Sequence, residues 1–326
     1  MSLNNQGTRA APEQATSDPL TGSDASSVAF AQPPQADADE QYVVRRPRPI
    51  ALTAAANVAK RNHKRQLPLR RAFAERPDNI DKPTPLARML RGGRGGSVRL
   101  RLYLSFLWLG AAPPHELTYP ARAWAELLDL DDPSGAGARR IADAVRWLEK
   151  NKFIEVTNRS GAPNVVRLLD DAGREKPYET PGTAFNRLRG KKPEAAQIHR
   201  YIQLPPELWT SGWMAVLSPA ALAMLIVLRV QVGAKDPDTE EVWISPEYAD
   251  KAFLLAEETR TRGVRELQRA GLVTIRRRQL VATDSFDFRR FRNVYQLHLG
   301  ALATPAAVRV PVKDAPAPHG STLPGF

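Results

Sequence analysis

Cysteine is absent from the 326 residues of this sequence. Disulfide bonds and metal sites built on thiolates are therefore excluded, and a reducing, cytoplasmic compartment is the natural expectation. The five histidines are scattered along the chain without the spacing of metal ligands, so no metal site is expected.

The sequence also lacks the motifs of common enzyme classes. It has no Gly-x-Ser-x-Gly elbow, no His-Glu-x-x-His pair and no nucleotide-binding loop. Its acidic clusters, Glu257-Glu258 and Asp129–Asp132, fall at an expected helix start and in a turn, where carboxylates have ordinary structural roles. We therefore expect no catalytic residue, no cofactor and no small-molecule effector, and we expect that the chain is not an enzyme.

Long apolar runs are missing as well. The most apolar stretch, Ala220–Leu228, is far too short to span a bilayer. The N-terminus does not have the basic-then-apolar pattern of a secretion signal. No membrane partner is expected.

Positive charge is what the chain has in excess. Its 47 lysines and arginines outnumber its 35 acidic residues and give a net charge of +12. Such a balance favours a polyanionic partner, nucleic acid before membrane. Composition does not separate DNA from RNA, but no aromatic stacking platform for RNA bases is visible.

Composition and apolar period together divide the chain into six segments. The terminal segments are polar or rich in proline and alanine, without apolar period, which is typical of disorder. The basic segment is either an arm that assists DNA binding or a solvated flexible arm. In order, the segments are a disordered acidic and polar tail (1–44), a basic and partly helical arm (45–83), a folded domain (84–170), a connector (171–199), a second folded domain (200–300) and a disordered tail (301–326).

One block of sequence occurs twice. Val145–Val156 matches Val264–Ile275 position for position. In both, a stripe of apolar residues with helical spacing leads into a short run of strand-forming residues. Proline begins the preceding helix in each copy, at Pro120 and Pro246, and the first copy has its extra residues in the turn Asp131–Gly137. Insertions are tolerated in turns, so the length difference supports the repeat.

Around each block the same order of elements is predicted: helix, strand, helix, helix, strand, hairpin tip, strand. The expected fold class is mostly α with small β-hairpins (α+β). The first copy has expected helices at 98–111, 121–130 and 138–151 and strands at 116–119, 153–157 and 164–169, and the second has helices at 220–232, from 246 and up to 270 and strands at 241–244, 272–277 and 294–299.

These residues resemble the winged helix-turn-helix superfamily, most clearly at Thr259–Val273, where an arginine-rich helix is followed by Gly-Leu-Val and a strand. Two such blocks in one chain resemble the tandem winged-helix initiators of plasmid replication. The resemblance implies two tandem winged-helix domains whose third helices dock in major grooves. One departure is Arg260, which aligns with the core position Ile141. Either its stem packs while its charged head reaches solvent, or the helix start is shifted.

The candidate DNA-binding residues lie on the solvent faces of the two third helices and on the hairpins. Arginine suits this role because its planar fork pairs with guanine O6 and N7, and the alternative is an ordinary solvated charged face. They are Arg139, Arg140, Arg146, Lys150 and Arg159 in the first copy, and Thr259, Arg262, Arg265, Arg269, Arg276, Arg277, Arg278, Arg289, Arg290 and Arg292 in the second.

Resemblance and charge together predict a non-enzymatic, sequence-specific protein that binds double-stranded DNA. Its role would be that of a transcriptional regulator or a plasmid replication initiator, associated with the nucleoid or a plasmid, and assembly of two or more copies on DNA is left open. The alternative is a winged-helix protein-interaction module, which an exposed Trp147 would favour. Because Arg262 stands where the first copy has Asp143, we expect the copies to read unlike half-sites.

Overall fold

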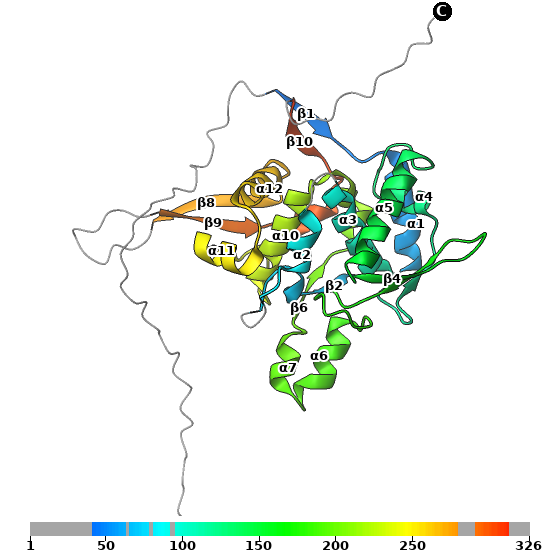
Figure 1. Ribbon diagram of the computed structural model, residues 1–326. Coiled ribbons are helices and arrows are strands. Elements are labelled where there is room, and N and C mark those ends of the chain that lie inside the picture. The colour runs from blue at the N-terminus through cyan, green and yellow to red at the C-terminus, as the bar shows by residue number, and fades with distance from the viewer. Residues whose placement is uncertain (1–40, 63–64, 78–80, 92–94, 280–290, 313–326) are drawn as a thin grey trace, which may run out of the picture. The chain divides into compact units, whose positions relative to one another are not determined.

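The computed structural model describes residues 41–62, 65–77, 81–91, 95–279 and 291–312 (Figure 1). Helices are combined with small antiparallel sheets of two or three strands, so the predicted α+β class is confirmed. Among the described residues, no helix has both the length and the apolar character needed to cross a membrane.

The first copy of the repeat contains three helices and a three-stranded sheet. The strands follow the order β3-β5-β4, and both pairings are antiparallel. The predicted hairpin over its last two strands is therefore confirmed. Its elements are α3 (Gly96–Leu109), β3 (Glu116–Leu117), α4 (Ala121–Leu127), α5 (Ala136–Lys150), β4 (Ile154–Thr157) and β5 (Val165–Leu168).

The second copy has the same elements in the same order. Its strands follow the order β7-β9-β8, so the first strand pairs with the third and the third with the second, as in the first copy. The tip of its hairpin, residues 280–290, lies outside the described residues. The elements are α10 (Pro219–Val232), β7 (Glu241–Val242), α11 (Pro246–Phe253), α12 (Glu257–Arg269), β8 (Val273–Gln279) and β9 (Phe291–Leu297).

The two copies also share the backbone geometry at the end of the third helix. The residues that follow α5 and α12, Lys152 and Gly271, both have a positive φ, of 59° and 73°. The next amides, those of Phe153 and Leu272, each donate at 2.9 Å to the carbonyl five residues earlier. This is the hydrogen-bond pattern of a Schellman helix end. The repeat seen in the sequence is therefore a repeat of structure.

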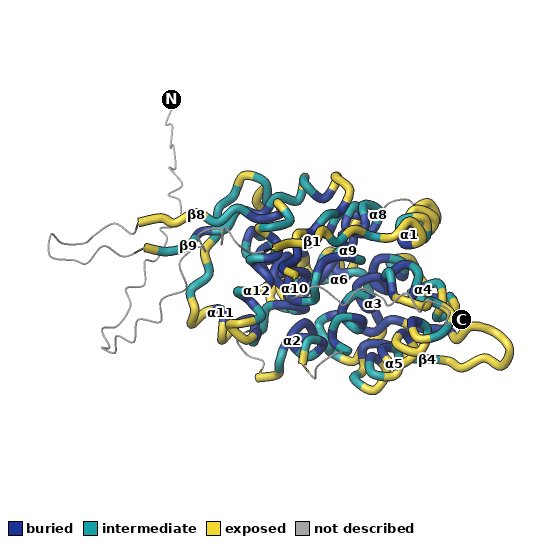
Figure 2. The backbone as a smooth tube through the Cα atoms, turned by 90° about the horizontal axis from the view of Figure 1, so that it is seen from above, coloured by how far each residue is buried: buried dark blue, intermediate teal, exposed yellow. Residues whose placement is uncertain are grey.

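The central helices of the two copies are buried along most of their length. α3 and α10 both lie in the darkly coloured interior of Figure 2, while the hairpins β4–β5 and β8–β9 extend to opposite sides, with buried residues at their bases and exposed residues toward their outer ends. On α5 the buried residues include Ile141, Ala144 and Leu148, which pack toward α3. An apolar stripe at this spacing orients a helix and turns its opposite face to solvent.

Arg260 departs from both expectations drawn from its alignment with Ile141. Helix α12 begins at Glu257, so the position stays inside the helix, and only 6% of Arg260 is exposed. Its side chain is almost entirely buried, and Nη1 donates to the carbonyl of Leu255 at 2.7 Å and pairs with Asp250 at 2.5 Å. A buried cation is tolerated where hydrogen bonds and a counter-charge satisfy it.

The segment 45–83, expected as a basic arm, instead contributes to the packed core. Helix α1 (Pro49–Arg61) buries Ala51, Ala55 and Ala59, and η1 (Arg71–Phe73) follows the strand β2 (Leu67–Arg70). Strand β2 pairs with β6 (Tyr201–Leu204), which is far away in the sequence. The segment was expected to be an arm because of its many basic residues. It also has alanines at helical spacing, and small residues on one face allow a helix to pack closely.

Two strands lie in segments that were expected to be mostly disordered tails. β1 (Tyr42–Arg45) falls in the expected N-terminal tail, and β10 (Val308–Pro311) with η3 (Gly300–Ala303) falls largely in the expected C-terminal tail. The two strands pair with each other, and Val308 is completely buried. Pairing of the two ends of a chain leaves no local signal in either of them. Residues 1–40 and 313–326 lie outside the described residues.

Short helices occupy the remaining connections. α2 (Pro85–Leu90) follows Thr84, whose hydroxyl accepts a hydrogen bond from the amide of Ala87 at 3.1 Å. Trp209 and Trp213 are buried, each with 2% exposure. The expected connector, residues 171–199, contains two further helices. These two are α6 (Pro181–Arg189) and α7 (Pro193–Gln197). Two more short helices, α8 (Glu207–Thr210) and α9 (Trp213–Val216), follow the connector.

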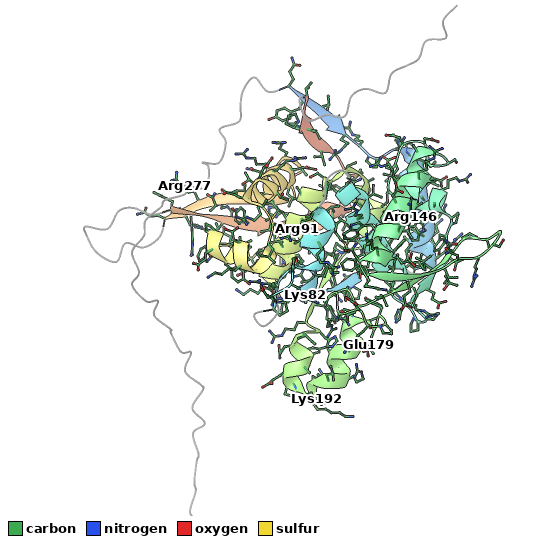
Figure 3. All side chains as sticks on the ribbon, in the orientation of Figure 1. Lys82, Arg91, Arg146, Glu179, Lys192 and Arg277 are labelled. Atoms are coloured by element: carbon green, nitrogen blue, oxygen red, sulfur yellow. The ribbon has the colours of Figure 1, made fainter. Side chains whose placement is uncertain are left out.

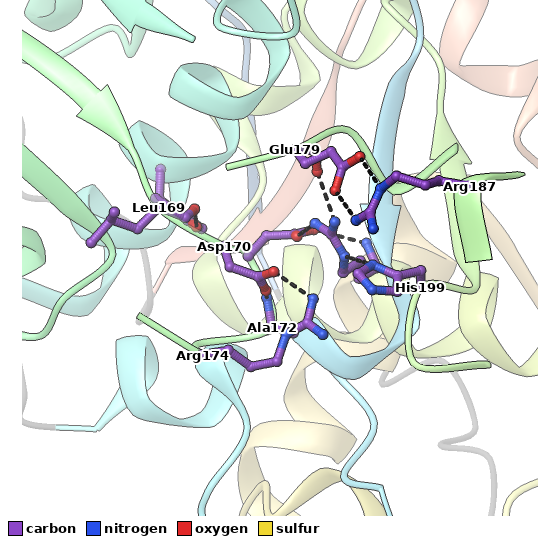
Figure 4. A network of polar contacts seen from close by, with 10 residues as sticks. Leu169, Asp170, Ala172, Arg174, Glu179, Arg187 and His199 are labelled. Carbon is purple, nitrogen blue, oxygen red and sulfur yellow. Dashed lines mark hydrogen bonds and ion pairs between the residues drawn. The ribbon is translucent and has the colours of Figure 1, made fainter. Parts of the chain in front are cut away.

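A buried polar network attaches this connector to β2 (Figure 4). The side chains of Arg70 and Asp171 form an ion pair with no solvent exposure, and the amide of Arg70 also donates to Asp171, at 2.9 Å. The guanidinium donates to Nδ1 of His199 at 3.1 Å and to the carbonyl of Glu179 at 2.7 Å. Burial by itself would lower the pKa of Arg70, but attraction to Asp171 and Asp170 outweighs burial and raises it. The arginine is therefore firmly charged and holds three parts of the chain together.

Candidate nucleic-acid interface

Helix α5 exposes the cations predicted for it. Arg139, Arg140 and Lys150 are all exposed and form no ion pair within the described residues. Arg146 is exposed too (Figure 3), but it pairs with Asp143 one turn earlier on the same helix. At the hairpin, Arg159 is also exposed. The first copy therefore presents a cationic helix face in which one charge is partly neutralised.

Helix α12 exposes a narrower face than predicted. Arg262 is exposed, while Thr259, Arg265 and Arg269 are only half-exposed. The guanidinium of Arg269 lies 5.9 Å from the ring centre of Tyr42, which belongs to β1. The N-terminal strand thus covers the end of this face, a contact between residues too far apart in sequence for the helix pattern to reveal.

The arginines of the second hairpin divide between its two faces. Arg276 and Arg278 both pair with Glu241 on β7, at 2.5 and 2.9 Å, and their hydrogen bonds lower the pKa of Glu241 below its ordinary value. On the other face, Arg277 lies 4.5 Å over the ring of Phe291 and extends outward (Figure 3). The sequence of the hairpin does not reveal this neutralisation, because Glu241 belongs to another strand of the sheet. Among the described residues, Arg277 is thus the cation of β8 without an acidic partner.

Of the three remaining arginines predicted for the hairpin, only Arg292 is among the described residues. Arg292 lies 4.9 Å over the ring of Trp243 and is half-exposed. Arg289 and Arg290 lie outside the described residues. The first copy repeats the pairing between strands, because Arg167 on β5 pairs with Glu116 on β3 at 2.7 Å.

Arg101, which the sequence analysis did not single out, joins the two copies. It lies on α3, and its guanidinium donates to the carbonyls of Ala215 at 3.1 Å and Leu217 at 2.6 Å, just before α10 begins. Burial lowers the pKa of Arg101 to about 10, with a further contribution from the nearby charge of Arg45, so the side chain stays charged at neutral pH. An arginine inside an otherwise apolar helix was the available signal for this role.

The described residues of the site offer charged groups and hydrogen-bond donors. In the part of the chain that the structure describes, no group of three or more histidine, aspartate or glutamate side chains is placed to hold a metal ion. No protein-family model matches the chain, and comparison with curated proteins and with solved structures gives no match.

Proposed function

We propose that this chain binds double-stranded DNA through two winged-helix domains, one in each copy of the repeat. The observation that carries the proposal is the duplication itself: α5 and α12 each precede a hairpin, pack one face inward and turn a cationic face outward. An α-helix fits the major groove of B-DNA, and in domains of this kind the third helix enters it.

The partner suggested by the charges is a polyanion. Arg139, Arg140, Lys150 and Arg262 are exposed cations without ion-pair partners among the described residues. Arginines that no carboxylate neutralises are available for phosphates or for guanine edges. Since Asp143 occupies the position that Arg262 has in the second copy, the two helices would read unlike half-sites.

The alternative role, a protein-interaction module, is less well supported. Trp147 would be its exposed aromatic residue, but it is half-buried, with its ring 5.9 Å from that of Phe153 and beneath the guanidinium of Arg99 at 4.7 Å. A side chain packed on both faces is poorly placed to insert into a partner. On DNA, the role we propose is control of transcription or initiation of plasmid replication. Mapping of bound sites across the genome separates these two, because an initiator binds one clustered locus.

The test is a binding measurement on the full chain. A bound sequence is first selected from a random pool of double-stranded DNA, and affinity is then measured by fluorescence anisotropy. Arg262→Ala with Arg265→Ala should lower specific affinity by at least about tenfold, because each base contact contributes about 1–3 kcal/mol. The matched control is Arg189→Ala with Lys192→Ala, which removes the same charge from exposed positions around α6 and α7.

The control pair should leave affinity within about threefold of the wild type, since long-range charge effects are screened at physiological salt. Equal losses in both double variants would show that total charge, and not α12, governs binding. Absence of any selected sequence would refute the proposal outright.

A further inference from the structure

The segment Tyr42–Arg48 crosses from one proposed recognition helix to the other. Figure 1 shows β1 and β10 between α12 on one side and α4 and α5 on the other. At the α12 end, Arg45 pairs with Glu266 at 3.1 Å, and the same carboxylate accepts the amide of Ser218 at 2.7 Å. Arg269 lies over the ring of Tyr42. This end of the segment is therefore fixed to α12 and to the start of α10.

The other end is fixed to the turn that precedes α5. The side chain of Arg48 pairs with Asp129 at 2.5 Å and with Asp131 at 3.2 Å. Its amide and its guanidinium make two further hydrogen bonds to Asp129, at 3.1 and 2.9 Å. Four polar contacts that converge on one arginine make this a defined attachment and not a chance approach.

The outward side of the strand pair is cationic. We call β1 and β10, with Arg46, the ribbon. Within β10, Val308 and Val310 are buried. Arg309, which is opposite Val44, is exposed, and so is Arg46. Neither of these two arginines has an ion-pair or hydrogen-bond partner among the described residues, and no acidic residue occurs in 42–48 or 308–312. Arg45 and Arg48 hold the ribbon to the protein, while Arg46 and Arg309 are left for another partner.

We propose that the ribbon is a third DNA contact, placed over the minor groove between the two major grooves that α5 and α12 would occupy. The inference rests on the proposed function. When two helices enter successive major grooves on one side of B-DNA, the minor groove between them faces the same side. Position between the helices and unneutralised arginines meet the requirement there, because a narrow minor groove and its flanking phosphates attract arginine. Arg46 and Arg309 contact the phosphates along this groove.

Hydroxyl-radical footprinting of the full chain on its selected DNA tests this placement. The wild type should protect two outer segments and a central one between them. Arg46→Ala with Arg309→Ala should keep the outer protection, lose the central protection, lower affinity by about tenfold and reduce the slope of log affinity against log salt by about two. The control is again Arg189→Ala with Lys192→Ala, and circular dichroism of each variant verifies folding.

The possible results are separable. A wild-type footprint with two outer segments and an unprotected centre would overturn the ribbon contact and leave the proposed function standing. Unchanged or tighter binding by the ribbon variant would also overturn it, and tighter binding would show that the ribbon covers the helices instead of contacting DNA. A wild type that protects no DNA would refute the proposed function, and this inference with it.

Discussion

The two copies of the repeat place their third helices alike but hold them by different means. α5 packs with Ile141, Ala144 and Leu148, a purely apolar stripe. At the positions aligned with Ile141 and Ala144, α12 has Arg260 and Gly263. The charge of Arg260 is met by hydrogen bonds and an ion pair, and Gly263, which has no side chain, allows α12 to lie close to α10. What the copies retain is the direction of the exposed face, and the chemistry of the buried face has diverged.

The surroundings of the copies differ as well. The chain that leaves β5 enters the ionic network of Arg70, Asp171 and His199, which has three members without appreciable solvent contact. Within the second copy, α12 instead packs on α10, nearly all of whose residues are buried and apolar. The first copy should therefore respond to lost charges and to pH, and the second to changes of side-chain volume.

The largest effect is expected from breaking the buried ion pair. Arg70→Met leaves the Asp171 carboxylate buried without its counter-charge, and removal of one partner of a buried pair typically costs about 3–5 kcal/mol. The free energy of unfolding, measured in urea, should fall by this amount. Arg187→Met is the control, because its ion pair with Glu179 is at the surface, where water and salt screen the attraction and leave little net stabilisation. Equal losses in the two variants would contradict the special role of the buried pair.

The second prediction concerns the close contact between α12 and α10. A Cβ atom added at Gly263 would lie 2.3 Å from the carbonyl oxygen of Ala220, which is backbone and cannot turn aside. Gly263→Ala should therefore lower the free energy of unfolding by about 3 kcal/mol, the upper range for overpacking. Ala144→Gly, the reverse change at the aligned position of the first copy, should cost only about 1 kcal/mol from helix propensity. If Gly263→Ala were as stable as the wild type, the contact would be wrong.

The smallest effect of the three is the pH response of the first copy. Burial, together with the charges of Arg70 and Arg174, lowers the pKa of His199 from 6.5 to about 4, although Asp170 and Glu179 lie nearby. Between these values the unfolded chain binds a proton that the folded chain does not. Stability should therefore fall as pH is lowered from 6.5 to 4, by on the order of 2 kcal/mol from this residue.

His199→Asn isolates that contribution, because the asparagine Oδ1 lies near the position of the imidazole Nδ1 and can still accept the hydrogen bond from Arg70, but the amide does not titrate. Unfolding in urea at pH 7 and pH 4.5 should show a smaller loss of stability in the variant than in the wild type. Parallel losses in the two proteins would show that His199 is not the group responsible.

The repeat and the orientation of its third helices can be predicted from local patterns in the sequence. Matching positions in Val145–Val156 and Val264–Ile275 predicted a helix leading into a strand twice, and α5, β4, α12 and β8 are found there. These predictions succeed because periodicity is local: a stripe of apolar residues orients its own helix wherever the helix lies. The exposed arginines of α5 follow from the same stripe.

Which of the basic residues are left without a counter-charge depends on how the whole chain packs. Glu241 neutralises Arg276 and Arg278 from another strand. Asp171, which is 101 residues from Arg70 in the sequence, forms a buried ion pair with it. The pairing of β1 with β10 likewise joins segments whose compositions indicated disorder. A charge pattern shows how many cations a segment carries, but their counter-charges arrive through contacts distant in sequence, which depend on how the whole chain packs.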